Sequence, residues 1–208
     1  MEPGGQVTRL TLVSLPVPRQ TVPNRPERMQ MVEVRDLTQT YKSGKGVFNL
    51  TFSIGEGEVF GYLGPNGAGK TTTIRNLLGF ANADAGSASI HGLDCRKDAA
   101  TLHRMIGYLP GETAFLENMS GNEFLNFIRD MRGTKQNERR SELIERFEFD
   151  PRGNIKKMSK GMKQKLAIVA AFMHDPAVYI LDEPTSGLDP FMQNVFLTLL
   201  EEERHRGK

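Results

Sequence analysis

The sequence predicts an α/β fold with an antiparallel β subdomain and a helical subdomain insert, and three observations support this. Two alternating apolar patterns flank a turn, a short apolar run leads through a glycine-rich turn into a helix, and a long helical stretch separates two further apolar runs. With 208 residues, 38% of them hydrophobic, the chain is long enough to bury one substantial core with a smaller subdomain.

The antiparallel strands are expected at the start of the folded part. Residues 31–37 (MVEVRDL) and 47–54 (VFNLTFSI) alternate apolar and polar side chains, as half-buried strands do, and 42–46 (KSGKG) has the composition of a turn. Residues 1–30 show little apolar period and hold five of the eleven prolines: Pro3, Pro16, Pro18, Pro23 and Pro26. We therefore expect 1–30 to be a disordered N-terminal extension and 31–208 to be the folded domain.

Three further runs are predicted to form the buried strands of the core. Residues 58–64 (EVFGYLG) lead into a helix that begins near Lys70, and 106–109 (IGYL) and 177–181 (AVYIL) are short and apolar. A strand, a glycine loop and a helix in that order form an architecture that binds phosphate.

The stretch between the last two strands predicts a helical subdomain at about 112–160. Ser120 and Glu123 fit an S-x-x-E capping box, and two amphipathic helices are expected over 134–149 and 160–175. The apolar residues after the capping box are interpreted as core, with a partner-binding face as the alternative: Phe124, Leu125, Phe127, Ile128 and Met131.

Composition excludes several classes of function. The formal net charge of +2 is too near balance to indicate a nucleic-acid surface, so no nucleic acid is expected as a partner. A single cysteine, Cys95, forms no internal disulfide and fits a reducing compartment as an ordinary thiol. The longest apolar run, 166–173, falls far short of the roughly 20 residues that span a bilayer, so a membrane role requires another subunit.

The run GPNGAGKT fits the phosphate-loop pattern G-x-x-x-x-G-K-[ST] without a mismatch and lies between a predicted strand and a predicted helix. Its glycines let backbone N–H groups point at phosphate oxygens, and the helix N-terminus adds a partial positive charge. Lys70 is expected to reach the β and γ phosphates, and Thr71 to hold Mg²⁺. A glycine-rich turn that caps a helix without a ligand is the alternative. The predicted nucleotide-binding residues here are Gly64, Pro65, Asn66, Gly67, Ala68, Gly69, Lys70, Thr71 and Thr72.

Two adjacent acids follow the strand at 177–181. Asp182 stands at its carboxyl end, where α/β sheets bind ligands, and is expected to contact Mg²⁺ through water. Glu183 is placed to polarise a water that attacks the γ-phosphate. A solvated Asp-Glu-Pro turn is the alternative, but the phosphate loop independently requires a metal-binding acid.

Together the motifs resemble the ATP-binding cassette (ABC) ATPases that drive ABC transporters, with a P-loop NTPase core, and the resemblance covers 31–208. Besides GPNGAGKTT and YILDEPTSGLDP, the family's signature motif, usually Leu-Ser-Gly-Gly-Gln, is matched by MSKGM at 158–162. Ser159 and Gly161 are kept, and the form SKGMKQ resembles the cassettes of bacterial ABC-2 type exporters.

The resemblance implies a second ABC ATPase subunit in a head-to-tail dimer, with each ATP held between one phosphate loop and the other subunit's Ser159 and Gly161. It also implies that Tyr41 stacks on adenine and that Asp189 couples the two sites; their plain alternatives are a packing residue and a helix N-cap. The lysines around the signature are expected to contact nucleotide charge, with a solvated face as the alternative: Lys156, Lys157, Lys160, Lys163 and Lys165.

Two departures from the family pattern qualify these expectations. Gly111, followed by Glu112, occupies the place where the family commonly has a glutamine at the metal. After the helix that follows Asp189, the family has a strand ending in a histidine, whereas His205 comes too early for that role and is interpreted as a helix-end cation. We therefore expect a cassette truncated at the C-terminus, with ATP binding largely intact, weak hydrolysis and reduced stability.

The resulting hypothesis is an ATP-binding and ATP-hydrolysing subunit, using ATP and Mg²⁺, that powers export through a separate integral membrane permease. Such a subunit would be cytoplasmic, on the inner face of the cell membrane. The alternatives are a nucleotide-binding fragment with little turnover and a soluble ABC ATPase without a transport role.

Overall fold

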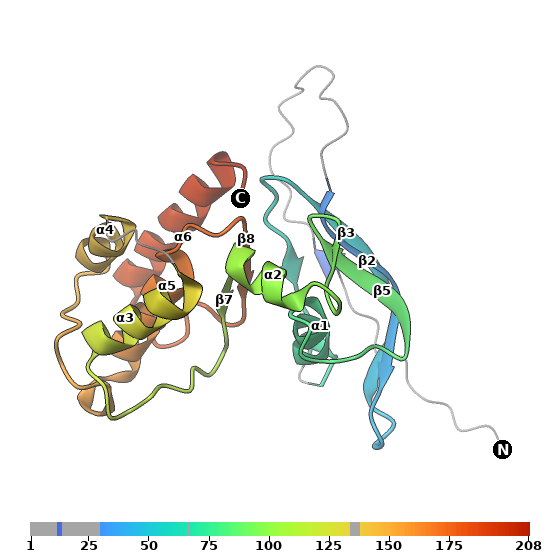
Figure 1. Ribbon diagram of the computed structural model, residues 1–208, viewed down its shortest axis with the longest axis horizontal. Helices are drawn as coiled ribbons and strands as arrows, with labels where there is room; N and C mark the ends of the chain where they lie inside the picture. Colours follow the sequence, from blue (N-terminus) through green and yellow to red (C-terminus); the bar gives the residue numbers. More distant parts are fainter. Residues whose placement is uncertain (1–11, 14–29, 66, 134–137) are drawn as a thin grey trace. The chain divides into compact units, whose positions relative to one another are not determined.

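The computed structural model describes residues 12–13, 30–65, 67–133 and 138–208. The chain divides into two compact units, one of residues 1–102 with Gly207 and one of residues 103–206 with Lys208 (Figure 1). The predicted extension at 1–30 lies mostly outside the described residues, apart from the short strand β1 (Leu12–Val13) and Gln30. Its disorder therefore stays a prediction.

The first unit is built on an antiparallel sheet. Strands β2 (Gln30–Thr40) and β3 (Gly46–Gly55) pair as the predicted hairpin, and β5 (Ala85–Ile90) and β6 (Leu93–Asp94) extend the sheet in the order β3-β2-β5-β6. The alternation of small and polar residues in β5 gave no strand signal, because Ala, Gly and Ser are poor strand formers. The hairpin prediction is confirmed.

The strand predicted over 58–64 is shorter and less buried than expected. Only β4 (Gly61–Tyr62) is a strand; it is half-buried and pairs antiparallel with β1. Val59 and Leu63, which the prediction placed in the core, are 48% and 56% exposed. The prediction was wrong because an apolar run alone does not show whether neighbouring strands cover it.

Helix α1 (Lys70–Leu77) follows β4, as predicted, and contributes Thr73 and Leu77 to the buried interior of this unit. Helix α2 (Ala99–Met105) was not predicted and ends where β7 begins. Cys95 is buried, and burial raises the pKa of its thiol to about 12, so the thiol is protonated at neutral pH.

The second unit places two parallel strands among helices. Strand β7 (Ile106–Leu109) pairs with β8 (Val178–Leu181), from Ile106 opposite Val178 to Leu109 opposite Leu181. Both strands were predicted. Strand β7 is largely buried, but β8 is half-buried throughout, less than expected.

Four α-helices and a short 3-10 helix complete the described part of this unit. They are α3 (Gly121–Arg132), α4 (Glu138–Arg146), η1 (Ile155–Lys157), α5 (Lys160–Phe172) and α6 (Pro190–His205). The capping box of α3 is confirmed, since Ser120 Oγ accepts from the Glu123 backbone N–H and Glu123 Oε2 accepts from that of Ser120. The helical subdomain expected at about 112–160 stays a prediction.

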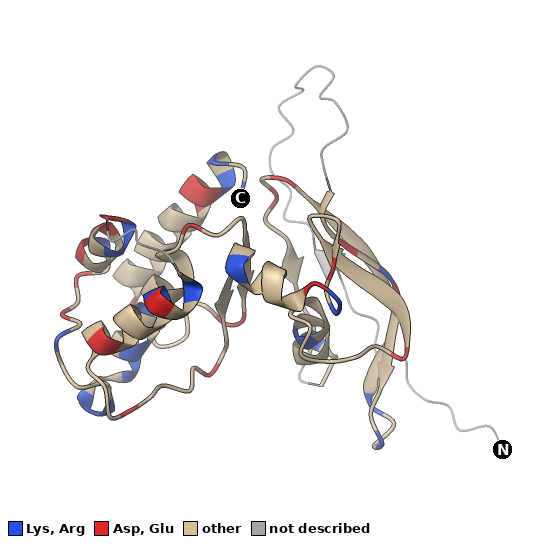
Figure 2. Cartoon of the chain, viewed as in Figure 1, with Lys and Arg blue, Asp and Glu red and all other residues tan. Residues whose placement is uncertain are grey.

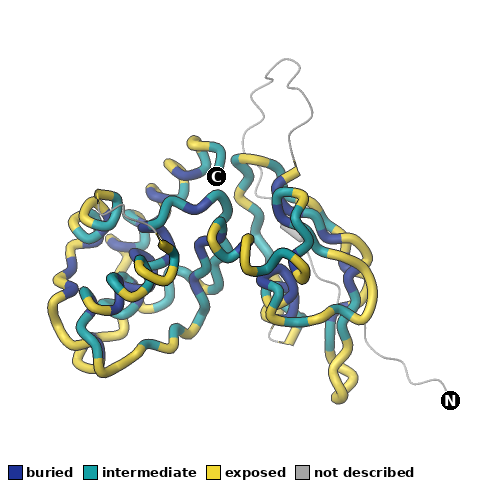
Figure 3. The backbone as a smooth tube through the Cα atoms, in the orientation of Figure 1, coloured by how far each residue is buried: buried dark blue, intermediate teal, exposed yellow. Residues whose placement is uncertain are grey.

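The core of this unit lies between its helices, where Figure 3 shows the buried stretches. Phe172 of α5 stacks on Tyr179 of β8 with ring centroids 4.2 Å apart and meets the Phe196 ring of α6 edge-on. Of the apolar residues of α3 predicted as core, Phe124 and Leu125 are buried, Ile128 is partly buried, and Phe127 and Met131 are exposed.

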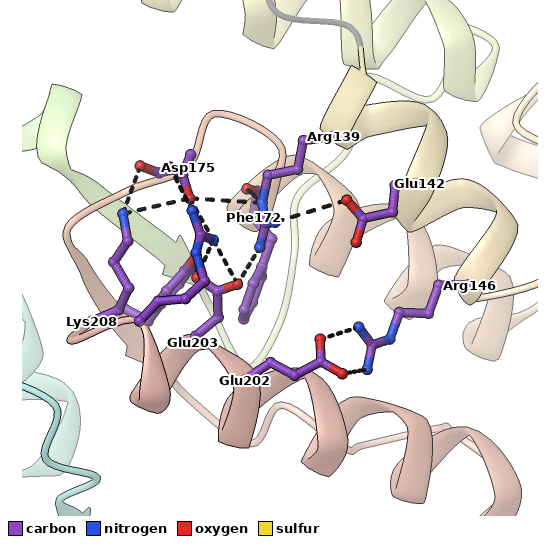
Figure 4. A network of polar contacts seen from close by, with 10 residues as sticks. Arg139, Glu142, Arg146, Phe172, Asp175, Glu202, Glu203 and Lys208 are labelled. Carbon is purple, nitrogen blue, oxygen red and sulfur yellow. Dashed lines mark hydrogen bonds and ion pairs between the residues drawn. The ribbon is translucent and has the colours of Figure 1, made fainter.

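A polar network joins α4 to the C-terminal end of α6 (Figure 4). Glu203, only 3% exposed, accepts hydrogen bonds from Arg139 of α4, from the Tyr179 hydroxyl at 2.9 Å and from Arg206. Asp175 forms ion pairs with Arg206 and other cations of the same region. The buried carboxylate of Glu203 requires its hydrogen-bond partners, because an unpaired charge in the protein interior is costly.

No helix in the described ranges has the length and hydrophobicity needed to cross a membrane. Acidic and basic segments are interspersed along both units in Figure 2, in keeping with the near-balanced charge. Charge alone therefore indicates no partner.

Candidate functional site

The phosphate loop, Gly64–Thr71, has the backbone that a phosphate-binding loop requires. Gly67 and Gly69 have φ values of 83° and 92°, in the left-handed region that only glycine adopts freely. A Cβ on Gly69 would lie 2.3 Å from Val47 Cγ1, whereas one on Gly67 would meet nothing within 4 Å. Asn66, also predicted in this site, lies outside the described residues.

The N-terminus of α1 begins in this loop. Gly69 is its N-cap residue, and no side chain caps the helix. The first N–H groups of a helix have no partner within the helix, so an uncapped N-terminus leaves donors and a partial positive charge for an anion. Thr71 is exposed at this end of the helix.

Lys70 lies across its own loop. Its ammonium donates to the carbonyl oxygen of Gly64 at 2.5 Å and to that of Pro65 at 3.1 Å. Thr73, one turn further along α1, is held by the Gly69 carbonyl and by the Tyr62 hydroxyl. The loop is thus tied together by Lys70 of the motif and by Thr73, just beyond it.

Tyr41 lies beside the same helix. Its backbone closes the β2–β3 turn, accepting from Gly44 and donating to Lys45, and the residue is 40% exposed. The Thr72 hydroxyl donates to the Tyr41 hydroxyl at 3.5 Å, at the limit of a hydrogen bond. Tyr41 and Thr72 therefore lie together, with part of the aromatic ring open to solvent.

The acidic loop, Asp182–Asp189, follows β8 in the second unit. The backbone N–H of Asp182 donates to the Leu109 carbonyl of β7 at 2.8 Å, which continues the parallel pairing up to this carboxylate. Glu183 is exposed and has a φ of 47°, a strained value for a residue with a side chain. No local sequence pattern predicted this backbone conformation of Glu183.

Gly111, at the position where the family commonly has glutamine, adjoins the first acid. A Cβ built on Gly111 would lie 3.4 Å from Asp182 Cγ and Oδ2, which is ordinary van der Waals contact. Residue 111 is therefore next to the Asp182 carboxylate but brings no side chain to it. Glu112 is exposed.

The signature stretch at 158–162 forms the start of α5. Ser159 is its N-cap, and Ser159 Oγ accepts from the Met162 backbone N–H at 3.2 Å, which leaves the hydroxyl proton free to donate elsewhere. A Cβ on Gly161 would lie 2.9 Å from the Gly187 carbonyl oxygen, so glycine is required by close approach to the acidic loop. Among the signature lysines, Lys163 forms an ion pair with Glu117.

Asp189 ends the acidic loop and begins α6. Its carboxylate accepts from the Met192 backbone N–H at 3.0 Å, and Pro190 follows in the first turn, so the plain N-cap role is present. Asp189 is exposed. Its coupling role stays a prediction.

One residue at this site was missed from the sequence. Gln164 of α5 is buried, and its Nε2 donates to the Pro184 carbonyl oxygen at 2.7 Å. A signal was available, because Gln164 falls on the same helical stripe as Ile168 and Phe172, and a polar residue on an apolar stripe requires a buried partner.

Comparison with known proteins defines the class. The ABC transporter family matches residues 47–186, and the chain belongs to that family. It is 37% identical over 162 residues to the bacitracin transport ATP-binding protein BcrA of Bacillus licheniformis. The aligned residues cover 77% of this chain and 53% of BcrA. The chain thus spans about half the length of the curated relatives it matches.

Solved structures agree on the fold. One described as the structure of an ATP-binding subunit of an ABC transporter matches with a TM-score of 0.75 and 31% identity, over 85% of this chain and 76% of that one. A bacterial ABC transporter cassette solved as a dimer has the same TM-score at 22% identity, over 86% of this chain and 85% of that one, and supports the fold alone. The P-loop NTPase fold predicted from the sequence is confirmed.

Proposed function

We propose that this chain binds ATP with Mg²⁺ and hydrolyses it as the ATP-binding subunit of an ABC exporter. The observation that carries the proposal is the phosphate loop: two glycines with positive φ, an uncapped N-terminus of α1, and Lys70 held within the loop. These features present N–H donors and a cation to phosphate oxygens, which is the property that distinguishes such a loop from a plain turn.

The residues proposed for Mg²⁺ fit its chemistry. The Thr71 hydroxyl and the Asp182 carboxylate are oxygen donors, the kind that Mg²⁺ prefers. Mg²⁺ is usually bound through one or two protein carboxylates together with substrate phosphate oxygens. When bound, the ion would neutralise charge on the β and γ phosphates.

Glu183 is the proposed general base. Its exposed carboxylate would hydrogen-bond a water and accept a proton from it as the water attacks the γ-phosphate. Lys70 would exchange its loop carbonyls for phosphate oxygens, and Tyr41, whose ring is exposed beside α1, would stack on adenine.

The partners proposed are a second ABC ATPase subunit and an integral membrane permease. In a head-to-tail dimer Ser159 would donate its free hydroxyl proton to the partner's γ-phosphate, Gly161 would let the helix end approach, and Asp189 would couple the two sites. The match to a bacitracin transport protein and the SKGMKQ form of the signature support a transporter subunit, placed on the cytoplasmic face of the membrane.

Two substitutions test the proposal, each with a matched control. Lys70→Ala should weaken ATP binding at least tenfold in calorimetry, whereas Lys97→Ala, an exposed lysine in the same unit, should not. Glu183→Gln should preserve ATP affinity and lower kcat about 100-fold or more. Its control is Glu148→Gln, because Glu148 is also exposed and also has a positive φ of 48°.

The outcomes separate the alternatives. Unchanged ATP affinity in the Lys70 variant would overturn the nucleotide site itself. ATP binding without turnover in the wild-type chain would favour a nucleotide-binding fragment. Turnover that does not respond to a co-expressed permease, with no membrane association, would favour a soluble ABC ATPase.

A further inference from the structure

We infer that Gln164 is the positioning residue for Glu183, holding the acidic loop so that this carboxylate can act as the base. The inference deepens the proposed function and rests on it. Its basis is a buried side-chain hydrogen bond from α5 to the residue that directly follows Glu183.

Glu183 has a backbone conformation that must be imposed from outside. Its φ is 47°, although a residue before proline ordinarily has an extended backbone with φ of about −120°. A non-glycine residue in the left-handed region costs about 1 kcal/mol or more and persists only where the surroundings determine it. The neighbours of Glu183 therefore decide where its carboxylate points.

Those neighbours are fixed on each side. Before Glu183, the Asp182 N–H is bonded to the Leu109 carbonyl of β7. Glu183's own carbonyl accepts from the Ser186 N–H at 3.0 Å, which closes a turn. After it, the Pro184 carbonyl accepts from Gln164 Nε2 at 2.7 Å, and among the described contacts this is the side-chain bond nearest to Glu183.

The position of Gln164 on α5 also suits it to anchor the acidic loop. It is 8% exposed and lies on the buried face of α5, so its side chain has little freedom. The first turn of α5 packs closely on the acidic loop, with Gly161 against the Gly187 carbonyl and the aliphatic stem of Lys160 against Gly187 itself. A movement of α5 would therefore move the loop with it.

The experiment replaces the donor and keeps the shape. Gln164→Met removes the N–H donor from a side chain of similar length, and Gln164→Glu places a carboxylate, which cannot donate when ionised, against the Pro184 carbonyl. The matched control is Gln193→Met, since Gln193 Nε2 donates to the Leu188 carbonyl at 3.0 Å, at the other end of the same loop. Steady-state ATPase kinetics and backbone hydrogen exchange over 183–188 are measured on each full chain.

For both Gln164 variants we expect kcat to fall at least tenfold with KM and ATP affinity within about twofold, because misplacing a catalytic group by about 1 Å can cost 100-fold. Exchange over 183–188 should quicken, since the Ser186 and Leu188 amides are bonded within this loop. The Gln193 variant should keep kcat within about twofold of wild type.

Three results would overturn the inference. They are an unchanged kcat in the Gln164 variants, an equal loss of kcat in Gln193→Met, or a loss that merely follows the folded fraction seen by circular dichroism. A wild-type chain that binds ATP without turnover would instead overturn the proposed hydrolysis. In that case the hydrogen-exchange data alone would test whether Gln164 anchors the acidic loop. Equal exchange over 183–188 in the wild type and in Gln164→Met would refute the anchoring.

Discussion

The buried position of Glu203 predicts a large and specific loss of stability when its charge is removed. Glu203 and Glu202 are adjacent on α6, and each carboxylate accepts hydrogen bonds from an arginine of α4, Arg139 and Arg146 respectively (Figure 4). Glu203 is 3% exposed and Glu202 is 51% exposed. The isosteric substitutions Glu203→Gln and Glu202→Gln therefore compare the loss of an arginine–carboxylate pair at a buried position and at an exposed one.

The structure gives the expected magnitudes. In the wild-type chain Arg139, Tyr179 and Arg206 donate to the two carboxylate oxygens of Glu203. In Glu203→Gln a single amide oxygen is left to accept from them, and the new amide N–H groups face these donors without an acceptor. Breaking a buried ion pair from one side costs about 3 to 5 kcal/mol, and about 3 is expected here because Arg139 keeps weaker pairs with Asp175 and Glu142. The exposed pair of Glu202 should contribute about 0.5 kcal/mol.

Urea unfolding followed by circular dichroism measures the difference. At a slope of about 2 kcal/mol/M, the Glu203 variant should lose about 1.5 M in its midpoint and the Glu202 variant about 0.25 M. Equal shifts in the two variants would refute the reasoning, because burial would then not set the energy of these pairs. A combined variant with Arg139→Met should cost less than the sum of the single changes if the two groups interact.

Two further predictions concern the phosphate loop and acid stability. Gly69→Ala should lower the free energy of unfolding by about 2 kcal/mol or more, because the new Cβ would collide with Val47. Gly67→Ala has open space around its Cβ and should cost only about 1 kcal/mol, for its positive φ. The urea midpoints of the two variants measure the difference. Burial, reinforced by the Arg132 guanidinium, lowers the pKa of His174 to about 4 from its ordinary 6.5, so unfolded chains take up the proton first as pH falls. The stability that neutral His174 contributes is fully present above pH 6.5 and is lost as the pH falls toward 4. Relative to His174→Gln, the free energy of unfolding of the wild-type chain should fall by up to about 3 kcal/mol over this range. Parallel pH profiles of unfolding for the two chains would contradict this.

Local signals account for the parts of the structure that the sequence predicted well. The capping box at Ser120, the N-cap Asp189 and the hairpin around Gly44 depend on a few neighbouring residues, so their geometry could be anticipated. The backbone of the phosphate loop belongs with them, since Gly67 and Gly69 occur where φ is positive.

Features set by distant parts of the chain could not be anticipated. Strand β5 consists mostly of small residues and is a strand because β2 and β6 pair with it. Arg139 and Glu203 are 64 positions apart, and no pattern in either helix announces their contact. The conformation of Glu183 opposes its local preference as a residue before proline, and only the surrounding structure explains it.

The hydrogen bonds of Lys70 to its own loop have a thermodynamic consequence for ligand binding. Because the ammonium already has the Gly64 and Pro65 carbonyls as acceptors, a phosphate would replace these contacts and would not simply add to them. The net enthalpy of binding should therefore be smaller than a count of new contacts suggests, while the entropic cost of ordering the loop is partly met before the ligand arrives. In the proposed nucleotide site, Lys70 would thus hold the loop in shape before a phosphate binds.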